Sequence, residues 1–332
     1  MIARLILTTL SLLFFSINAY ASVSTQEINF VSKSSGRTLV GEIYYPSSCK
    51  LEKKQIQHGI WMRENYSKNQ NCANNQDTHP LVIFSHGFQG DRFGNSWIAE
   101  ALVDKGYIVV MIDHTFNTSY DHSDLFIYTS MWQRPLDMSE LLTYLLEHPE
   151  WGKVINKDKI AALGFSLGGT TALWLSGIKA DKEKFRNSMD DKYARWSDWP
   201  KYALETAKAV NWTKAEQSYK DERIKAVISI APDLGEAFTK SGLKEADVPT
   251  LIIVGDKDRI TPKKENAEFY AKGIKGAELL VIDGAEHFTF MNKCSAIGFQ
   301  ITPNLCTSDD KKEKFHTQAI NKIYNFLQKN LQ

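Results

Sequence analysis

Short, almost entirely apolar runs recur along this chain, and most are followed by residues with helical periodicity. A strand that is apolar on both faces must be buried on both faces, as in a parallel sheet covered by helices. The alternation of such runs with helices predicts an α/β fold with a mostly parallel central sheet and helices on both faces. The runs lie at residues 81–84, 107–114, 159–166, 224–232, 250–256 and 277–283.

The segments between the runs have the patterns of helices and turns. Residues 96–106 predict a helix that ends at Gly106, and residues 135–148 predict an amphipathic helix. Before the first run, two β-rich segments flank residues 34–36 and predict a hairpin. Further helices are expected at residues 168–176, 264–272 and 312–331.

The first residues are typical of a secretory signal peptide. Arg4 precedes an apolar run at residues 5–17, and residues 19–21 form an A-x-A cleavage frame. The apolar run is shorter than a membrane-spanning helix requires. An uncleaved N-terminal anchor is the alternative. We therefore expect residues 1–21 to be a signal peptide, and residues 22–332 to form one domain of a periplasmic or secreted protein.

The balance of charge excludes two classes of partner. Lysine and arginine number 40, aspartate and glutamate number 39, and the net charge is +1. Nucleic-acid binding would need a strong basic excess, and docking to anionic membranes would need a polybasic cluster. We therefore expect no nucleic-acid partner and no polybasic docking to membranes. Because the N-terminal apolar run is too short to cross a bilayer, we also expect no integral membrane span in the mature chain.

The chain has four cysteines, and an even number suggests two disulfides in an oxidising compartment. The local pairings are Cys49–Cys72 and Cys294–Cys306, and each would close a polar, loop-like stretch. The other pairings and free buried thiols are the alternatives. None of the cysteines has the spacing of a zinc site, so we expect no metal.

One segment interrupts the alternation of strands and helices. Residues 178–222 are rich in charge and contain Trp196, Trp199 and Trp212. This insertion is predicted to form a helical, cap-like structure over a cleft. The alternative is a surface excursion in which the tryptophans only anchor the helices.

The stretch ALGFSLGGTTALW, residues 161–173, places Ser166 in a G-x-S-x-G frame. The apolar run before it and the helical pattern after it match the sharp strand-to-helix turn that presents a nucleophilic serine. Such a strained turn is crowded, so Gly164 and Gly168 are expected to be glycines for steric reasons. The helix that follows directs free N–H groups toward developing negative charge. We predict that Ser166 is a nucleophile rather than a polar residue of a Gly-rich connection.

A serine nucleophile needs a general base and a carboxylate that orients this base. His287 follows the last apolar run, and Asp258 follows the run before it in a compact G-x-x-D-x-x-x-P frame. The ends of successive parallel strands share one edge of the sheet, so these groups are expected near Ser166. Asp256 in the same turn and Asp233 after the preceding run are the alternative acids.

An oxyanion formed during acyl transfer needs two backbone N–H donors. Leu167, directly after the nucleophile, is expected to supply one, and Phe88 in the loop FSHGFQG the other. His86 in this loop is expected to be a structural hydrogen-bonding residue. His316 in the last helix is expected to be a surface or capping residue.

The motifs VIFSHGF, GFSLGG, GDKDRITP and GAEHFTF, in this order, resemble the α/β-hydrolase superfamily. Within it the chain is most similar to the predicted dienelactone hydrolases, which are related to platelet-activating-factor acetylhydrolases. The resemblance covers nearly the whole mature chain and implies a triad of Ser166, Asp258 and His287, without a cofactor. True dienelactone hydrolases have a cysteine where this chain has Ser166. The acid of the acetylhydrolases follows the earlier strand, which keeps Asp233 as an alternative.

These features predict an exported serine hydrolase that cleaves carboxylic esters through an acyl-enzyme. Phe88, Phe93 and the insertion suggest an apolar pocket for a small-molecule or lipid-like ester. An amidase, a peptidase or an acyltransferase would use the same triad, and a substrate panel would separate them. A non-catalytic binding protein on the same fold is the third hypothesis, and serine-directed labelling would separate it from an enzyme.

Overall fold

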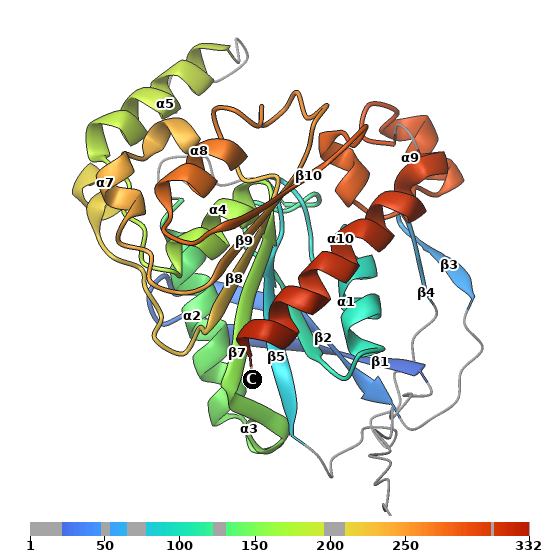
Figure 1. Cartoon of the computed structure of the whole chain (residues 1–332). Coiled ribbons are helices and arrows are strands. Elements are labelled where there is room, and N and C mark those ends of the chain that lie inside the picture. The colour runs from blue at the N-terminus through green and yellow to red at the C-terminus, as the bar shows by residue number, and fades with distance from the viewer. Residues whose placement is uncertain are drawn as a thin grey trace, which may run out of the picture.

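The computed structural model describes residues 22–47, 54–64, 78–121, 131–195, 210–306 and 309–331. The predicted signal peptide at residues 1–21 and the predicted Cys49–Cys72 disulfide lie outside the described residues. The described residues form an 8-stranded sheet with helices on both of its faces (Figure 1). None of the helices within these ranges is long and apolar enough to cross a membrane.

The strands of the sheet follow the order β1-β2-β6-β5-β7-β8-β9-β10, and those from β6 to β10 in this order run parallel. Alternate residues of a strand point to opposite faces. Val82 and Phe84 pack on one face of the sheet, and Leu81 and Ile83 pack on the other. Both faces are covered, which explains why the predicted strands are apolar throughout. The parallel strands are β5 (His79–Ser85), β6 (Ile108–Asp113), β7 (Ile155–Phe165), β8 (Ala226–Ile230), β9 (Thr250–Gly255) and β10 (Glu278–Ile282).

The predicted N-terminal hairpin is confirmed. Strands β1 (Ser22–Val31) and β2 (Thr38–Ser47) pair antiparallel, and β2 pairs antiparallel with β6. Gly36 lies in the connection with a φ of 68°, in the left-handed region that glycine tolerates. This hairpin extends the parallel sheet at one edge.

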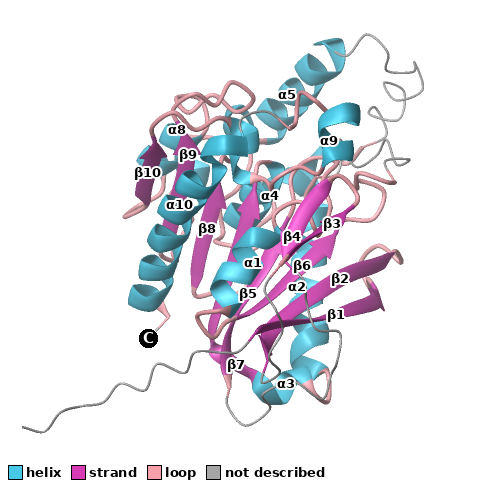
Figure 2. Cartoon of the chain, turned by 90° about the vertical axis from the view of Figure 1, so that its right-hand side faces the viewer, coloured by secondary structure: helices cyan, strands magenta, loops and turns pink. Residues whose placement is uncertain are grey.

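Two layers of helices cover the sheet (Figures 1 and 2). Helices α1 (Ser96–Val103) and α10 (Asp309–Asn330) pack on one face. Helices α2 (Gln133–Glu147), α4 (Leu167–Trp174) and α8 (Ala267–Gly273) pack on the other. The positions of these helices agree with the periodicity of the sequence. Short helices lie at α3 (Trp151–Val154) and α7 (Lys240–Leu243).

The structure describes part of the predicted insertion at residues 178–222. Within it lie α5 (Lys182–Arg195) and a 3-10 turn, η3 (Trp212–Glu216). Trp212 packs against Trp132 and Phe185, and Phe185 also packs against Trp174 of α4. Trp212 therefore anchors this segment on the layer of α2 and α4. Trp196 and Trp199 lie outside the described residues.

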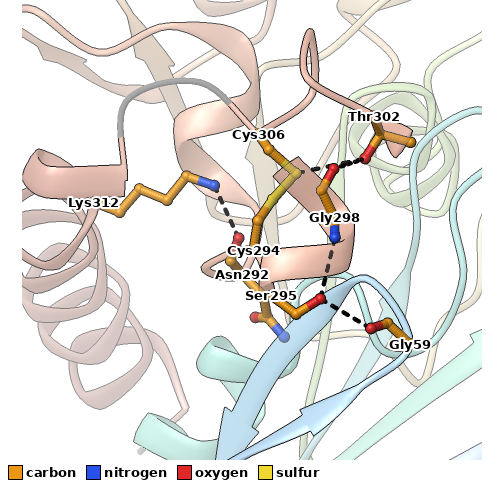
Figure 3. The surroundings of a disulfide bond; sticks show 8 residues. All are labelled: Gly59, Asn292, Cys294, Ser295, Gly298, Thr302, Cys306 and Lys312. Carbon is orange, nitrogen blue, oxygen red and sulfur yellow. Dashed lines mark hydrogen bonds between the residues drawn. A yellow bond between two sulfur atoms is a disulfide. The ribbon is translucent and has the colours of Figure 1, made fainter. Parts of the chain in front are cut away.

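A second, two-stranded sheet lies in a segment that the sequence predicts to be loop-like. Strands β3 (Gln55–His58) and β4 (Trp61–Glu64) form a hairpin with Gly59 at its turn. Trp61 makes an isolated β-bridge with Cys294, which forms the predicted disulfide with Cys306 (Figure 3). Helix α9 (Ala296–Ile301) lies between these two cysteines. The hairpin is thus held by contacts with residues far away in the sequence.

Replacing both cysteines of this disulfide by serine (Cys294→Ser with Cys306→Ser) should lower the free energy of unfolding by about 2–4 kcal/mol, because the bond restricts the unfolded chain. Urea unfolding without reductant measures this difference. An unchanged midpoint and slope would contradict a stabilising role of the bond.

Candidate active site

Ser166 lies on a sharp turn between β7 and α4. Its backbone has a φ of 55° and a ψ of −123°, which is a strained conformation for a residue other than glycine. The backbone N–H of Ser166 donates to the carbonyl oxygen of Ile230 at 2.8 Å, and this bond ties the turn to the end of β8. The side chain is 7% exposed. The hydroxyl group is therefore held at the edge of the sheet in a fixed, nearly buried position.

Two glycines make this turn sterically feasible. A Cβ at Gly164 would collide with the carbonyl oxygen of Gly168, and a Cβ at Gly168 would collide with the carbonyl oxygen of Ser85. All of these contacts are with backbone atoms, so a rotamer change could not relieve them. The expectation that both glycines are steric requirements is confirmed.

His287 and Asp258 meet Ser166 from the ends of two other strands. His287 begins the short turn η5 (His287–Phe290) after β10, and Asp258 follows β9. Ser166 Oγ lies 3.0 Å from His287 Nε2, and His287 Nδ1 lies 2.7 Å from Asp258 Oδ2. The carboxylate accepts a hydrogen bond from Nδ1–H, which leaves the lone pair of Nε2 directed at the serine hydroxyl. The three side chains thus form a continuous hydrogen-bonded row.

Thr261 fixes the carboxylate of Asp258, a role that the sequence reasoning missed. Asp258 Oδ1 accepts from the N–H groups of Ile260 and Thr261 at 2.9 and 2.8 Å, and Oδ2 accepts from Thr261 Oγ1 at 2.9 Å. Short polar side chains that bond to the backbone two or three residues ahead are a known turn signal. Residues 258–261 (DRIT) have this pattern, because Asp258 is a short polar residue and the N–H groups that it accepts from lie two and three residues ahead.

The two alternative acids make other contacts. Asp256 Oδ1 accepts from the N–H of Gly284 at 2.6 Å, and so links the turns after β9 and β10. The backbone of Asp233 exchanges hydrogen bonds with Thr170 Oγ1, and its carbonyl oxygen also accepts from the hydroxyl of Tyr270. Within the described residues, Asp258 is the acid that the structure brings to His287.

The two predicted oxyanion donors flank Ser166. Leu167 is the first residue of α4, so its N–H has no acceptor inside the helix. A Cβ at Gly87 would lie 3.2 Å from the Cβ of Ser166, which shows how closely the loop with Phe88 approaches. Phe88 itself lines the cavity into which Ser166 opens.

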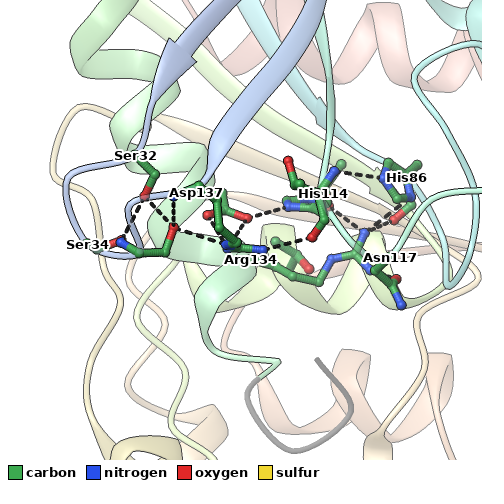
Figure 4. A network of polar contacts seen from close by, with 12 residues as sticks. Ser32, Ser34, His86, His114, Asn117, Arg134 and Asp137 are labelled. Atoms are coloured by element: carbon green, nitrogen blue, oxygen red, sulfur yellow. Dashed lines mark hydrogen bonds and ion pairs between the residues drawn. The ribbon is translucent and has the colours of Figure 1, made fainter. Parts of the chain in front are cut away.

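His86 has the structural role that the sequence suggests. Its Nε2 accepts from the N–H of His114 at 3.1 Å, so Nδ1 carries the proton and donates to the Gly87 carbonyl oxygen at 2.6 Å. A trans peptide directs its N–H away from its carbonyl, so the N–H of Phe88 points away from His86. Arg134 donates to the carbonyl oxygen of His86 (Figure 4). Burial, and secondarily the charge of Arg134, hold the pKa of His86 well below 6.5.

A second Ser–His–Asp row lies buried beneath this loop and was not predicted. His114 bonds Ser85 Oγ through Nε2 at 2.9 Å and Asp137 Oδ2 through Nδ1 at 2.9 Å. Ser85 is 0% exposed, so no substrate reaches it. Burial and the nearby Arg134 hold the pKa of His114 well below 6.5, which disfavours proton transfer to it. Arg37 donates to both oxygens of Asp137 and connects this row to the N-terminal hairpin.

His316 is partly buried rather than a freely exposed surface residue. It stacks on Trp97 with ring centroids 3.8 Å apart, and its Nε2 bonds the carbonyl oxygen of Thr289 at 2.9 Å. Trp97 Nε1 and Asn95 Nδ2 both donate to the carbonyl oxygen of Phe290 at 2.8 Å. Helices α1 and α10 therefore hold the η5 turn that carries the candidate base. Burial lowers the pKa of His316 to about 3.

Ser166 and His287 open into a cavity of about 650 Å³, a size typical of small-molecule sites. Its walls come from the loop after β5, the turns after β9 and β10, the β3–β4 turn and the segment around α9. None of the described residues of the insertion at residues 178–222 lines this cavity. Neither α5 nor η3 therefore contributes to the wall of this cavity. Among the described residues, no group of His, Cys, Asp or Glu side chains is arranged to hold a metal.

The sequence matches a known family and two kinds of curated esterase. The BD-FAE family model matches residues 66–272. A pimeloyl-(acyl-carrier protein) methyl ester esterase of Neisseria meningitidis is 28% identical over 166 residues, which are 40% of this chain and 53% of that protein. Cutinase est1 of Thermobifida alba is 22% identical over 218 residues, which are 64% of this chain and 54% of that protein. The matched region thus spans only about half the length of either relative.

The fold has a solved counterpart. The structure of a ferulic acid esterase from Streptomyces cinnamoneus superposes on this one with a TM-score of 0.61 at 15% sequence identity. The superposition covers 95% of this chain and 91% of the esterase chain. At this identity the likeness concerns the fold alone. It confirms the predicted α/β-hydrolase fold.

The low pKa of His316 predicts a specific pH dependence of stability. A histidine whose folded pKa is about 3 and whose ordinary pKa is 6.5 stabilises the fold fully above pH 6.5, and this contribution is lost as the pH falls toward 3. The loss is at most about 1.4 kcal/mol per pH unit. His316→Gln should therefore lose less stability than wild type between neutral and acidic pH, as measured by urea unfolding at several pH values. Parallel losses in both proteins would contradict a buried, neutral His316.

Proposed function

The chain belongs to the BD-FAE family, and we propose that it is a serine-dependent hydrolase of carboxylic esters. The observation that carries this proposal is the hydrogen-bonded row of Ser166, His287 and Asp258 at the wall of the cavity. The esterases among its relatives support the same reaction class. The motif resemblance to the dienelactone hydrolases and platelet-activating-factor acetylhydrolases is a finer assignment that we propose within the same superfamily.

In the proposed reaction, Ser166 Oγ attacks the ester carbonyl carbon while its proton passes to His287 Nε2. The resulting oxyanion accepts hydrogen bonds from the backbone N–H groups of Phe88 and Leu167. Asp258 keeps the Nδ1 proton of His287 in place and stabilises the imidazolium. The intermediate collapses, the alcohol leaves with the proton from Nε2, and an acyl group remains on Ser166.

Water completes the cycle. His287 Nε2 takes a proton from the attacking water, and the new tetrahedral intermediate expels Ser166 Oγ, which regains that proton. The products are one carboxylic acid and one alcohol for each water consumed. An amide would follow the same steps with a poorer leaving group, so the ratio of ester to amide turnover distinguishes an esterase from an amidase.

Replacing each candidate acid by asparagine should show which of the three carboxylates orients His287. Asp258→Asn should lower kcat for 4-nitrophenyl acetate by about ten-thousandfold, because an amide in this place favours the wrong tautomer of the histidine. Asp256→Asn and Asp233→Asn are matched controls, and both should retain activity close to wild type. Loss of activity in a control, with activity kept in Asp258→Asn, would overturn the assignment of the acid.

We also propose that the protein is exported and that residues 1–21 are its signal peptide. The disulfide between Cys294 and Cys306 supports export, since such bonds persist in oxidising compartments. N-terminal analysis of the exported protein should find its first residue after Ala21. A protein recovered from the cytoplasm with Met1 in place would contradict this proposal.

A further inference from the structure

Part of the lining of the cavity comes from two segments that are tied to each other through residues 293–295 and the disulfide. The first is the β3–β4 turn, residues 58–61, and the second is residues 301–305 at the end of α9. We call their cavity-lining residues the tied wall. We propose that the tied wall selects the substrate of the enzyme, and that it favours esters with one bulky apolar group. This inference rests on the proposed function and adds the substrate class and the residues that recognise it.

Hydrogen bonds join the first segment to residues 293–295, which lie just before α9 (Figure 3). The N–H of Ser295 donates to the carbonyl oxygen of Ile60 at 2.9 Å, and Ser295 Oγ donates to that of Gly59 at 3.1 Å. The N–H of Met62 donates to the carbonyl oxygen of Lys293 at 2.8 Å. The turn between β3 and β4 therefore cannot move away from residues 293–295 without breaking backbone hydrogen bonds.

The disulfide closes residues 294–306 into a loop that contains the second segment. Cys294 and Cys306 are 12 residues apart, and α9 lies inside the loop that they form. Thr302 Oγ1 donates to the carbonyl oxygen of Gly298 at 2.9 Å and lies 3.5 Å from the sulfur of Cys306. A Cβ at Gly298 would meet the carbonyl oxygen of Ile60 at 2.5 Å, so glycine permits this close packing. The tied wall is thus held on the α9 side by a covalent bond and on the hairpin side by hydrogen bonds.

The cavity that this wall faces is lined mainly by apolar side chains. Ile301 and Leu305 of the tied wall line it together with Phe88 and Phe288. Apolar lining rewards the burial of apolar substrate atoms and offers few partners for polar ones.

Two polar side chains that line the cavity, those of Asp91 and Asn95, are already bonded within the protein. Asp91 Oδ1 accepts from the N–H groups of Phe93 and Gly94, and Oδ2 accepts from Ser119 Oγ. Asn95 donates to the carbonyl oxygen of Phe290. These groups brace the walls, which leaves the apolar surface to recognise the substrate.

Exposed apolar side chains frame the mouth of the cavity. Tyr120 is 62% exposed, Ile260 is 60% exposed and Ile301 is 64% exposed, and all three line the cavity. Covering such exposed apolar side chains with an apolar group is favourable, because it removes apolar surface from water. Because they continue the cavity that holds Ser166, the group that covers them is part of the substrate.

Two isoleucines of α9 offer a matched test. Ile301 lines the cavity, whereas Ile297, one helical turn earlier, is 47% exposed and does not line it. Turnover of 4-nitrophenyl acetate, butyrate and octanoate varies the acyl group, and turnover of methyl, butyl and octyl acetates varies the alcohol. Ile301→Ser should lower the ratio of octyl-chain to short-chain kcat/KM by about tenfold in one of the series, whereas Ile297→Ser should keep the ratio of wild type. The double variant Cys294→Ser with Cys306→Ser should lower the ratio like Ile301→Ser.

Binding to the inactive Ser166→Ala protein separates this inference from the proposed function. Calorimetric titration with ethyl octanoate and ethyl acetate should show chain-length-dependent binding, which Ile301→Ser weakens in the same background. If Ile301→Ser turns over the esters with the chain-length ratios of wild type, the selective role of the tied wall is wrong, and the proposed esterase function is unaffected. If wild type turns over none of these esters, but binding depends on chain length and on Ile301, the selective role of the tied wall is supported and the proposed esterase function is wrong. If binding depends neither on chain length nor on Ile301, the selective role of the tied wall is wrong.

Discussion

The contact between backbone atoms at Gly164, Gly168 and Ser85 is the constraint on which the candidate site depends. It allows β7, the first turn of α4 and the end of β5 to approach more closely than any side chain would permit. The strained φ of Ser166 follows from this approach, and the bond from its N–H to Ile230 adds the end of β8. The serine, the loop with Phe88 and the first N–H of α4 therefore reach one place because of packing in the sheet itself.

Two layers of hydrogen bonds hold the loops around this centre. Beneath the loop after β5, Arg134 and His114 bind backbone and side-chain groups of Ser85 and His86, and Asp137 bonds His114 (Figure 4). On the other side, His316 and Trp97 bind consecutive carbonyl groups of η5. Desolvation keeps the pKa values of His86, His114 and His316 low, so these histidines stay uncharged at neutral pH, whereas Arg134 adds a buried positive charge to the first set. The loops around the candidate site are thus held by neutral histidines and one buried arginine.

The fold and the meeting of Ser166, His287 and Asp258 could be predicted from the sequence, because they follow from local patterns and from the geometry of parallel sheets. Each strand is a continuous apolar run, and each residue follows the end of such a run. The hairpin of β3 and β4 could not be predicted, since it is held by residues 293–295. The row of Ser85, His114 and Asp137 was missed for the same reason, because three separate elements contribute to it. The insertion carries tryptophans that suggested a cap, but Trp212 is an anchor on α2 and α4.

The central claim is that Ser166, and not another buried serine, carries the acyl group. The described residues include two Ser–His–Asp rows of similar geometry, which differ in access to the cavity and in the environment of the histidine. Labelling of the native protein with a fluorophosphonate, followed by peptide mass spectrometry, distinguishes them. The account predicts one adduct, on the peptide with Ser166, and an unmodified Ser85. An unlabelled protein, or an adduct that persists in Ser166→Ala, would contradict it.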